Sequence, residues 1–334
     1  MIDHKTYTTT NITRLLDDDD NPAPLSNWIP MATNFGRRRF NQPNSNRPTD
    51  TKNRIDEIMS QIAADKKDGL PQTTFTYFDS LQARAKLRVG KAPDNEGTNG
   101  DMLLCLPFYA VIDIHKLFHQ LYLDPTLSHP EQWTNVDFKG IPKTRETDKL
   151  DKLRWIAGIN VFRQWYSRVW GKSLIPRSLP PYFRRVRTYG FTPGFAPDDV
   201  VDFVVEGIRK AARWNMKQLL VITLDIKTAF DAMKHNTIHA SNKRLGAPPL
   251  TRAACIKDLS NKTATITLQQ AGTTPQFPVT SGGWQGGTAT HPSSKTLSPP
   301  ASPRPSTNGS IWVSAYTSKT NNLIMQYMLT TSSS

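Results

Sequence analysis

The chain has 334 residues, of which 25 are proline and 37% are hydrophobic, and its formal net charge is +14. This length accommodates one or two domains with a real core, but the low apolar content indicates that part of the chain is not packed. Two cysteines exclude a disulfide framework and a cysteine-based zinc site. The positive charge favours a polyanionic partner, with a merely basic soluble protein as the alternative.

The sequence carries no pattern for export or membrane insertion. The N-terminus lacks the apolar run of a secretory signal. The most apolar stretch, 102–123, contains Asp113, His115, Lys116 and His119, which make it too polar to span a membrane. We therefore expect a nuclear or cytoplasmic protein that is not secreted, and nothing in the sequence indicates an oligomer.

The first 85 residues are expected to be mostly disordered or linker, with one short helix. The acidic run 17–20 is typical of a solvated tail. The arginines at 37–39 suit a nuclear signal or a phosphate contact, and a solvated loop is the alternative. Between 53 and 66, isoleucines and a methionine recur at helical spacing, which predicts the short helix.

The middle of the chain alternates predicted helices and strands. Apolar residues over 101–123 recur at helical spacing, and His115 and His119 lie four residues apart there, which suits ordinary helix histidines better than a metal pair. Further along, the pattern predicts a hairpin strand from 136, helices over 155–170, 198–213, 226–242 and 253–259, and strands over 219–224 and 263–268, with an extended segment at 276–279. We expect the apolar face of the helix 198–213 to be buried.

The segment 139–187 is strongly basic. It holds thirteen lysine and arginine residues against three acidic residues, with aromatic side chains interleaved. Positive charge combined with stacking platforms suits single-stranded nucleic acid. A packed core with a solvated basic face is the structural alternative.

An apolar strand ending in a carboxylate is the most informative feature of the chain. The run 219–231 reads Leu-Leu-Val-Ile-Thr-Leu-Asp-Ile-Lys-Thr-Ala-Phe-Asp, which delivers Asp225 to the end of the strand and puts Phe230 in the helix that follows. Such a carboxylate suits a divalent metal ion, while a helix N-cap is the alternative for Asp225. A packed helix residue is the alternative for Phe230.

This strand resembles the first catalytic motif of reverse transcriptases from non-LTR (LINE-like) retrotransposons. Three further segments, 133–156, 189–195 and 280–287, are similar to the family's "W…IPK…R-PI", "GFRPG" and "GV-QG" segments and follow in the family's order. The lead-in 91–97 is similar to the family's "KAPG-DGI" but has Asp94 where the family has glycine. The resemblance covers about residues 90–287. Each segment alone is weak evidence, and the ordered set is specific.

The resemblance implies a right-hand polymerase that uses two Mg²⁺ ions, an RNA template, a DNA primer and dNTPs. Asp225 and the backbone carbonyl of Ile226 would then be metal ligands, and Phe230 would exclude a ribose 2′-hydroxyl. Gln285, Gly286 and Arg154 would contact template or incoming nucleotide. Further basic residues are expected to contact nucleic acid: Lys143, Arg163, Arg168, Arg184, Arg185 and Arg187.

One required motif of the family is missing. The family carries an Ala/Val-Tyr-x-Asp-Asp hairpin downstream, and an aspartate of this hairpin completes the metal site. No aspartate or glutamate follows Asp258 in this chain. A single carboxylate does not hold two metal ions for in-line transfer, so the chain as written is expected to be catalytically inactive.

A change of reading frame explains the missing motif. The residues 325–331 back-translate to codons that, with two bases skipped, permit Ala-Val-Tyr-Ala-Asp-Asp, with the aspartates at codons 330–331. Residues from about 288 onward would then be out-of-frame translation without selected structure. The Thr/Ser/Pro-rich stretch 288–310 fits this hypothesis.

The sequence therefore predicts an α+β protein with reverse-transcriptase-like fingers, an incomplete palm and disordered N- and C-terminal tails. The expected divisions are 1–85 as linker, 86–287 as fingers and partial palm, and 288–334 as a low-complexity, out-of-frame tail. Its function is that of an inactive fragment of an RNA-directed DNA polymerase. Two alternatives stay open: a basic nucleic-acid-binding module without catalysis, and a non-functional translated remnant.

Overall fold

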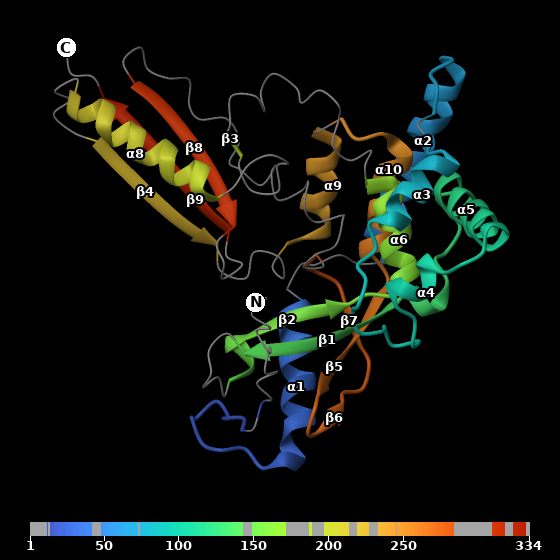
Figure 1. The fold of residues 1–334 in the computed structure, drawn as a ribbon, viewed down its shortest axis with the longest axis horizontal. Coiled ribbons are helices and arrows are strands. Elements are labelled where there is room, and N and C mark those ends of the chain that lie inside the picture. The colour runs from blue at the N-terminus through green and yellow to red at the C-terminus, as the bar shows by residue number, and fades with distance from the viewer. Residues whose placement is uncertain are drawn as a thin grey trace, which may run out of the picture.

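The protein is a mixed α+β structure with two separate β-sheets (Figure 1). The computed structural model describes residues 12, 14–41, 48–72, 74–142, 149–171, 187–188, 197–213, 219–226, 233–244, 246–283, 309–317 and 323–331. Within these residues, no helix is long and apolar enough to cross a membrane.

The described helices occur in two groups along the chain. The N-terminal half contains α1 (Leu25–Phe40), α2 (Pro48–Lys67), α3 (Tyr77–Ala85), α4 (Gly100–Leu104), α5 (Phe108–Leu123), α6 (Val161–Gly171) and the 3₁₀ turns η1 (Glu131–Trp133) and η2 (Leu150–Lys152). The later part contains α8 (Pro197–Arg213), α9 (His235–Arg244) and α10 (Pro249–Leu259).

The first sheet is built around the strand β5 and is covered by helices. Its strands are β1 (Asn135–Pro142), β2 (Leu153–Gly158), β5 (Lys262–Leu268), β6 (Gly272–Thr273) and β7 (Phe277–Val279). The order is β2-β1-β5-β6, and β7 also pairs with β5. β1 is antiparallel to β2 and parallel to β5. The strand predicted over 263–268 is present as β5, and its β-branched residues suit a strand that pairs on both sides.

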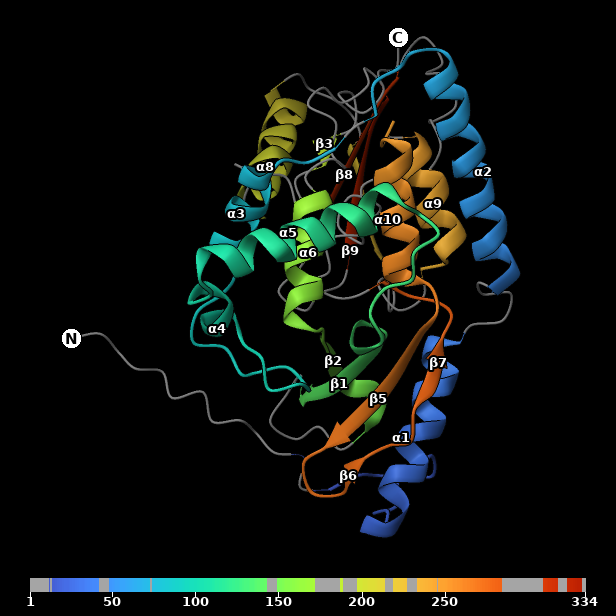
Figure 2. The same ribbon diagram turned by 90° about the vertical axis from the view of Figure 1, so that its right-hand side faces the viewer.

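The N-terminal segment is not the irregular linker that the composition suggested. Helix α1 contacts β5 and β7 (Figure 2). Its buried residues include Trp28, Ala32 and Phe40, which recur at multiples of four and so share one face. The ring of Phe40 stacks on that of Phe138 in β1 at 4.3 Å between centroids. The other faces of α1 carry polar residues, so the average hydrophobicity of the segment is low although one face is apolar.

Helix α2 also exceeds the short helix expected over 53–66. It spans 20 residues and buries Ile58 and Ile62 against the core, whereas Met59 is exposed. Its main helical neighbour is α10. The expected linker over 1–85 is therefore wrong for α1, α2 and α3, since each of the three contributes side chains to the hydrophobic core.

The predicted helix over 101–123 is two helices, α4 and α5. Pro107 lies between them, immediately before the first residue of α5. Proline lacks the amide hydrogen that a continuous helix needs, so one helix cannot run through this position. Val111, Phe118 and Leu121 are buried as expected, whereas Phe108 is 69% exposed. The predicted helix from 155 is similarly corrected: residues 153–158 form β2, and α6 begins at Val161.

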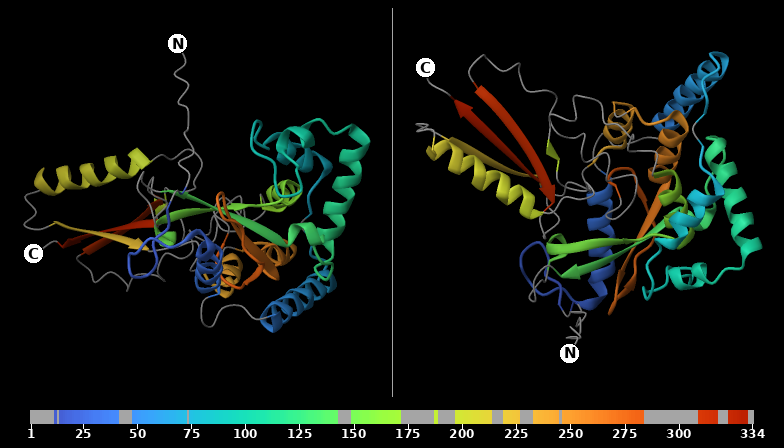
Figure 3. Two further views of the ribbon diagram at one scale, coloured as in Figure 1. Left: turned by 90° about the horizontal axis from the view of Figure 1, so that it is seen from below. Right: turned by 45° about the horizontal axis from the view of Figure 1, so that its top comes forward.

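The second sheet lies on one side of the molecule together with α8 (Figure 3). Its strands are β3 (Arg187–Thr188), β4 (Leu219–Ile226), β8 (Gly309–Thr317) and β9 (Leu323–Thr331), in the order β3-β8-β9-β4. Helix α8 contacts β8. Val201, Val205 and Ile208 of α8 are nevertheless exposed, so the expectation of a buried apolar face on this helix is wrong for these three residues.

Strands β8 and β9 also correct the expectation that the residues after 288 lack structure. β8 and β9 are antiparallel over nine residue pairs, from Gly309 opposite Thr331 to Thr317 opposite Leu323. Their sequences are rich in β-branched, aromatic and large aliphatic residues, which pack well in pleated strands whatever their genetic origin. Most of the stretch 288–310 lies outside the described residues.

Candidate active site and nucleic-acid interface

The candidate catalytic residue Asp225 is the next-to-last residue of β4. The expected strand is present over 219–226 and carries Asp225 and Ile226 at its C-terminal end. Asp225 lies opposite Ile324 and Ile226 opposite Leu323 in the antiparallel pairing with β9. Because Leu323 also pairs with the last residue of β8, the end of β4 lies beside the closed end of the β8–β9 hairpin. The backbone thus presents one carboxylate-bearing strand end next to a β-hairpin.

The hairpin brings no second carboxylate to this place. Neither β8 nor β9 contains aspartate or glutamate, and Asp225 is the single acidic residue in the four described strands of this sheet. No group of three potential metal ligands occurs among the described residues. Two Mg²⁺ ions need several oxygen ligands. This donor set therefore does not fit the metal pair that the sequence resemblance implies.

The strand register also keeps positions 330 and 331 away from Asp225. Thr330 lies opposite Leu219, six residues before Asp225 on β4. Six residues of extended strand span roughly 20 Å. Carboxylates introduced at 330 and 331 in this register would not share a metal ion with Asp225, so a chain in the other frame needs a different hairpin register to complete the site.

Several predicted contact residues lie outside the described part of the chain. These are Lys143, Arg184, Arg185, Phe230, Gln285 and Gly286. Arg187 is described only as part of the backbone of β3, where it lies opposite Ser314 of β8. The predicted roles of these seven residues stay predictions.

Arg154 does not share a sheet with Asp225. It lies on β2 in the first sheet, opposite Ile141 of β1, and its side chain is half-buried. Arg154 and Asp225 therefore belong to different sheets. The strand pairing does not bring them together, so it gives no support for their contacting the same nucleotide.

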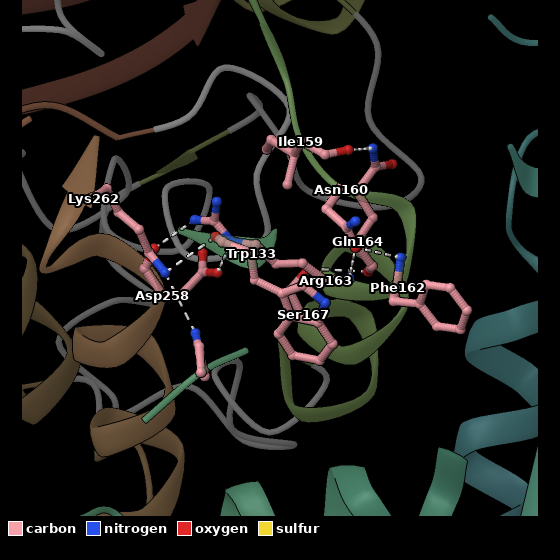
Figure 4. A network of polar contacts seen from close by, with 10 residues as sticks. Trp133, Ile159, Asn160, Phe162, Arg163, Gln164, Ser167, Asp258 and Lys262 are labelled. Atoms are coloured by element: carbon pink, nitrogen blue, oxygen red, sulfur yellow. Dashed lines mark hydrogen bonds and ion pairs between the residues drawn. The ribbon is translucent and has the colours of Figure 1, made fainter. Parts of the chain in front are cut away.

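Arg163 is a correction to the predicted nucleic-acid-binding set (Figure 4). Its side chain is 1% exposed, and its Nε donates to Asp258 Oδ1 at 2.7 Å. Its Nη2 donates to the backbone oxygen of Asp258, so the guanidinium fixes the end of α10 against α6. Arg163 is a core residue, and a basic sequence pattern cannot distinguish it from a surface arginine.

The same buried region holds further polar groups. Lys262 Nζ donates to the backbone oxygen of Trp133 at 3.3 Å, and burial lowers the pKa of Lys262 well below its ordinary value. Burial likewise lowers the pKa of His129, which faces Lys262. Tyr122 and Thr251 share a buried hydrogen bond of 2.8 Å, and burial raises the pKa of Tyr122 to about 12. These groups join α5, α6, α10 and β5 at the core of the protein.

Arg168 and the histidine pair on α5 also hold parts of the fold together. Arg168 donates from Nη1 to the backbone oxygen of Lys86, and burial lowers the pKa of its guanidinium. His115 Nδ1 shares a hydrogen bond of 2.9 Å with Ser80 Oγ. His119 Nε2 shares one of 3.0 Å with Thr74 Oγ1. The two imidazoles thus link α5 to the preceding segment, in agreement with ordinary helix histidines.

A groove beside α1 collects basic and aromatic groups that the sequence placed in a tail. It has a volume of about 560 Å³. The ring of Phe35 lies 5.4 Å from that of Trp155 between centroids, and the guanidinium of Arg39 lies 5.4 Å from the centre of the Phe35 ring. Arg38 and Lys149 also line the groove, together with Asp17, Asp18 and Asp151. The four-residue spacing of Phe35 and Arg39 on a helix could have revealed this pairing, once 25–40 was recognised as helical.

Comparison with protein-family models gives no match for this chain, and comparison with curated proteins gives none either.

Proposed function

We propose that the chain is a catalytically inactive fragment of an RNA-directed DNA polymerase of the non-LTR retrotransposon type. The observation that carries the proposal is the apolar strand β4, which ends in Asp225 and Ile226 beside a β-hairpin. Four ordered sequence segments over about 90–287 support it. The coarse α+β architecture is compatible with it.

Inactivity follows from the donor set. Nucleotidyl transfer by this class needs two divalent metal ions bridging phosphates and the primer 3′-hydroxyl. The sheet that carries Asp225 offers no second carboxylate in its described strands, and the sequence has none after Asp258. The fragment can therefore bind nucleic acid at most, and no catalytic step is assigned to its residues.

The decisive test is the nucleotide sequence across codons 280–334 and beyond. The proposal expects that a shift of frame after about codon 287 opens a reading frame through Tyr-Ala-Asp-Asp. A coding sequence in which codons 330–331 cannot yield two aspartates in the shifted frame contradicts the reading-frame hypothesis. The polymerase lineage would then depend on β4 alone.

The groove beside α1 favours a second function, which is nucleic-acid binding without catalysis. Arg38, Arg39 and Lys149 line it together with three aspartates, so its formal charges balance, and phosphate contacts would come from the individual basic groups beside the ring of Phe35. Binding that uses phosphate contacts weakens steeply as salt rises. The Arg38→Gln variant should bind single-stranded RNA more weakly and with a smaller salt slope than the wild type in a fluorescence-anisotropy titration.

A matched control for this titration is Lys116→Gln. Lys116 lies on α5, and its side chain is 67% exposed and paired with Asp113. Both substitutions remove one exposed positive charge, so equal losses of affinity would mean that net charge, and not the groove, governs binding. Binding that requires Mg²⁺ would also count against this second function.

A further inference from the structure

A buried cluster of basic side chains lies where α2, α9 and α10 meet. Arg54 comes from α2, His235 and His239 from α9, and Arg252 from α10, and all four line one small cavity. Arg54 is 8%, His235 3% and Arg252 2% exposed. The three helices therefore direct two guanidinium groups and two imidazoles toward one small cavity.

Many of the nitrogen atoms in this cluster have no hydrogen-bond partner among the described residues. They are Nη1 and Nη2 of Arg54, Nε and Nη1 of Arg252, Nδ1 of His235, and Nδ1 and Nε2 of His239. Buried polar groups in proteins are almost always hydrogen-bonded, and an unmet donor is costly. The guanidinium nitrogens among them are donors, whereas Nδ1 of His235 is an acceptor, because its Nε2 donates to the Gly282 carbonyl. A group that accepts hydrogen bonds is needed in the cavity to satisfy the guanidinium donors.

Charge favours an anion over a neutral acceptor. Both guanidinium groups stay protonated at neutral pH, because the ordinary arginine pKa lies far above it. A water molecule accepts hydrogen bonds but cannot balance two buried positive charges, whereas an anion does both. Nearby acidic residues only partly offset this charge. The carboxylate of Glu57 lies 2.6 Å from Lys243 Nζ and 3.9 Å from His239 Nε2, and its side chain is half-exposed. Gln61, which accepts from Arg252 Nη2, is neutral.

The size of the cavity limits the anion. Its volume is about 10 Å³, which corresponds to one water-sized particle. A monoatomic anion is larger than water and enters this space only if the surrounding side chains move apart slightly, whereas sulfate, phosphate and carboxylates are larger still. The apolar part of the lining, Ile238, Ile256 and Leu259, closes the cavity around the basic groups.

We propose that this cluster is a binding site for a halide ion, chloride under ordinary conditions, which ties α2 to α9 and α10. The ion accepts hydrogen bonds from the guanidinium groups of Arg54 and Arg252 and from the single N–H of the neutral His239 imidazole. The site is structural and is independent of any polymerase ancestry, since none of its residues belongs to the strand β4 or to the groove beside α1.

Thermal unfolding of the full chain in chloride and in gluconate, at equal ionic strength, tests the proposal. Gluconate is too large for the cavity. Because a ligand that binds only the folded state stabilises it by mass action, we expect a saturable rise in Tm of roughly 2–4 °C in chloride. Equal Tm values in the two salts would overturn the proposal and leave a water molecule as the occupant.

Variants separate this site from general salt effects. Arg252→Met should abolish the dependence of Tm on chloride, whereas Arg38→Met, which removes an exposed arginine from α1, should retain it. A full chloride response in Arg252→Met would overturn the assignment. If Arg252→Met does not fold, Arg54→Gln serves the same purpose.

A measurement on the wild type needs no variant. The ³⁵Cl NMR line of a chloride solution should broaden on addition of the protein and should narrow again when bromide is added as a competitor. Broadening that bromide does not reverse, or no broadening at all, would count against a halide site.

Discussion

Arg163 on α6 and Asp258 on α10 form an ion pair with 2.7 Å between Nε and Oδ1, and their side chains are 1% and 3% exposed. The pair connects two helices that are 95 residues apart in sequence. A buried charge without its partner is strongly unfavourable. The stability of the helical layer is therefore expected to depend on both members of the pair.

Asp258→Ala should lower the free energy of unfolding by about 3–5 kcal/mol, because it leaves the Arg163 guanidinium buried and uncompensated. Urea unfolding followed by circular dichroism measures this loss. The control Asp113→Ala breaks an exposed pair with Lys116 and should change stability by less than about 1 kcal/mol. The double variant Arg163→Met/Asp258→Leu should be more stable than Asp258→Ala; a double variant that is no better would mean that packing, and not charge, dominates.

Gly36→Ala should destabilise the contact between α1 and the first sheet. A Cβ atom at Gly36 would lie 2.5 Å from Cζ of Phe277 and 3.0 Å from Cδ1 of Ile266, both of which are buried. Overpacking of this kind costs about 1–3 kcal/mol, and the higher helix propensity of alanine offsets about 1 kcal/mol of that cost. We therefore expect a net decrease in the free energy of unfolding, measured by chemical denaturation.

Asn34→Ala on the same helix is the control for Gly36→Ala, because Asn34 is exposed. It should leave stability unchanged or slightly raised. Combining Gly36→Ala with Phe277→Leu should recover part of the loss. If Gly36→Ala alone proves neutral or stabilising, α1 does not pack on β7 as closely as described.

Stability should fall as the pH is lowered from about 6.5 to 4. Burial lowers the pKa of His235 to about 4, its hydrogen bond to the Gly282 carbonyl acts in the opposite direction, and Arg54 adds to the lowering. Above the ordinary histidine pKa near 6.5, the imidazole is neutral in both the folded and the unfolded state. Its contribution to the free energy of unfolding is therefore fully present there. Between 6.5 and 4 only the unfolded state binds the proton, which costs the folded state up to about 3 kcal/mol.

Urea midpoints measured between pH 4 and 7 in gluconate check this pH dependence without halide binding. In His235→Gln, stability should fall less steeply between pH 6.5 and 4, because this variant lacks the imidazole that titrates. Asn34→Ala, at an exposed position without an ionisable group, provides the control and should keep the wild-type slope. An equal slope in wild type and His235→Gln would show that other groups dominate the acid sensitivity.

Asp225→Asn should matter only when the downstream frame is restored. The chain as written should show no primer extension, with or without this substitution, because its sheet offers a single carboxylate. A version that carries the shifted frame after about codon 287 should extend an RNA-templated primer in Mg²⁺, and Asp225→Asn should reduce that activity to background. Extension that survives Asp225→Asn would refute Asp225 as a metal ligand.

The sequence by itself determined the elements whose signal is local. The apolar strand ending in Asp225, the alternating strand β5 and the proximity of His115 and His119 on one helix all follow from periodicity over a few residues. The absence of any acidic residue after Asp258 likewise needs no structure. These observations were enough to propose a polymerase lineage and its loss of activity.

Only the tertiary structure decided which basic residues are buried and which strands become neighbours. Arg163 reads as a surface residue until Asp258 is brought to it from 95 positions away, and the four-member cluster of Arg54, His235, His239 and Arg252 draws on three helices. The register of β9 against β4, which keeps position 330 away from Asp225, is likewise a non-local choice. Burial and pairing depend on long-range packing, and a short-range sequence pattern carries no information about the partner.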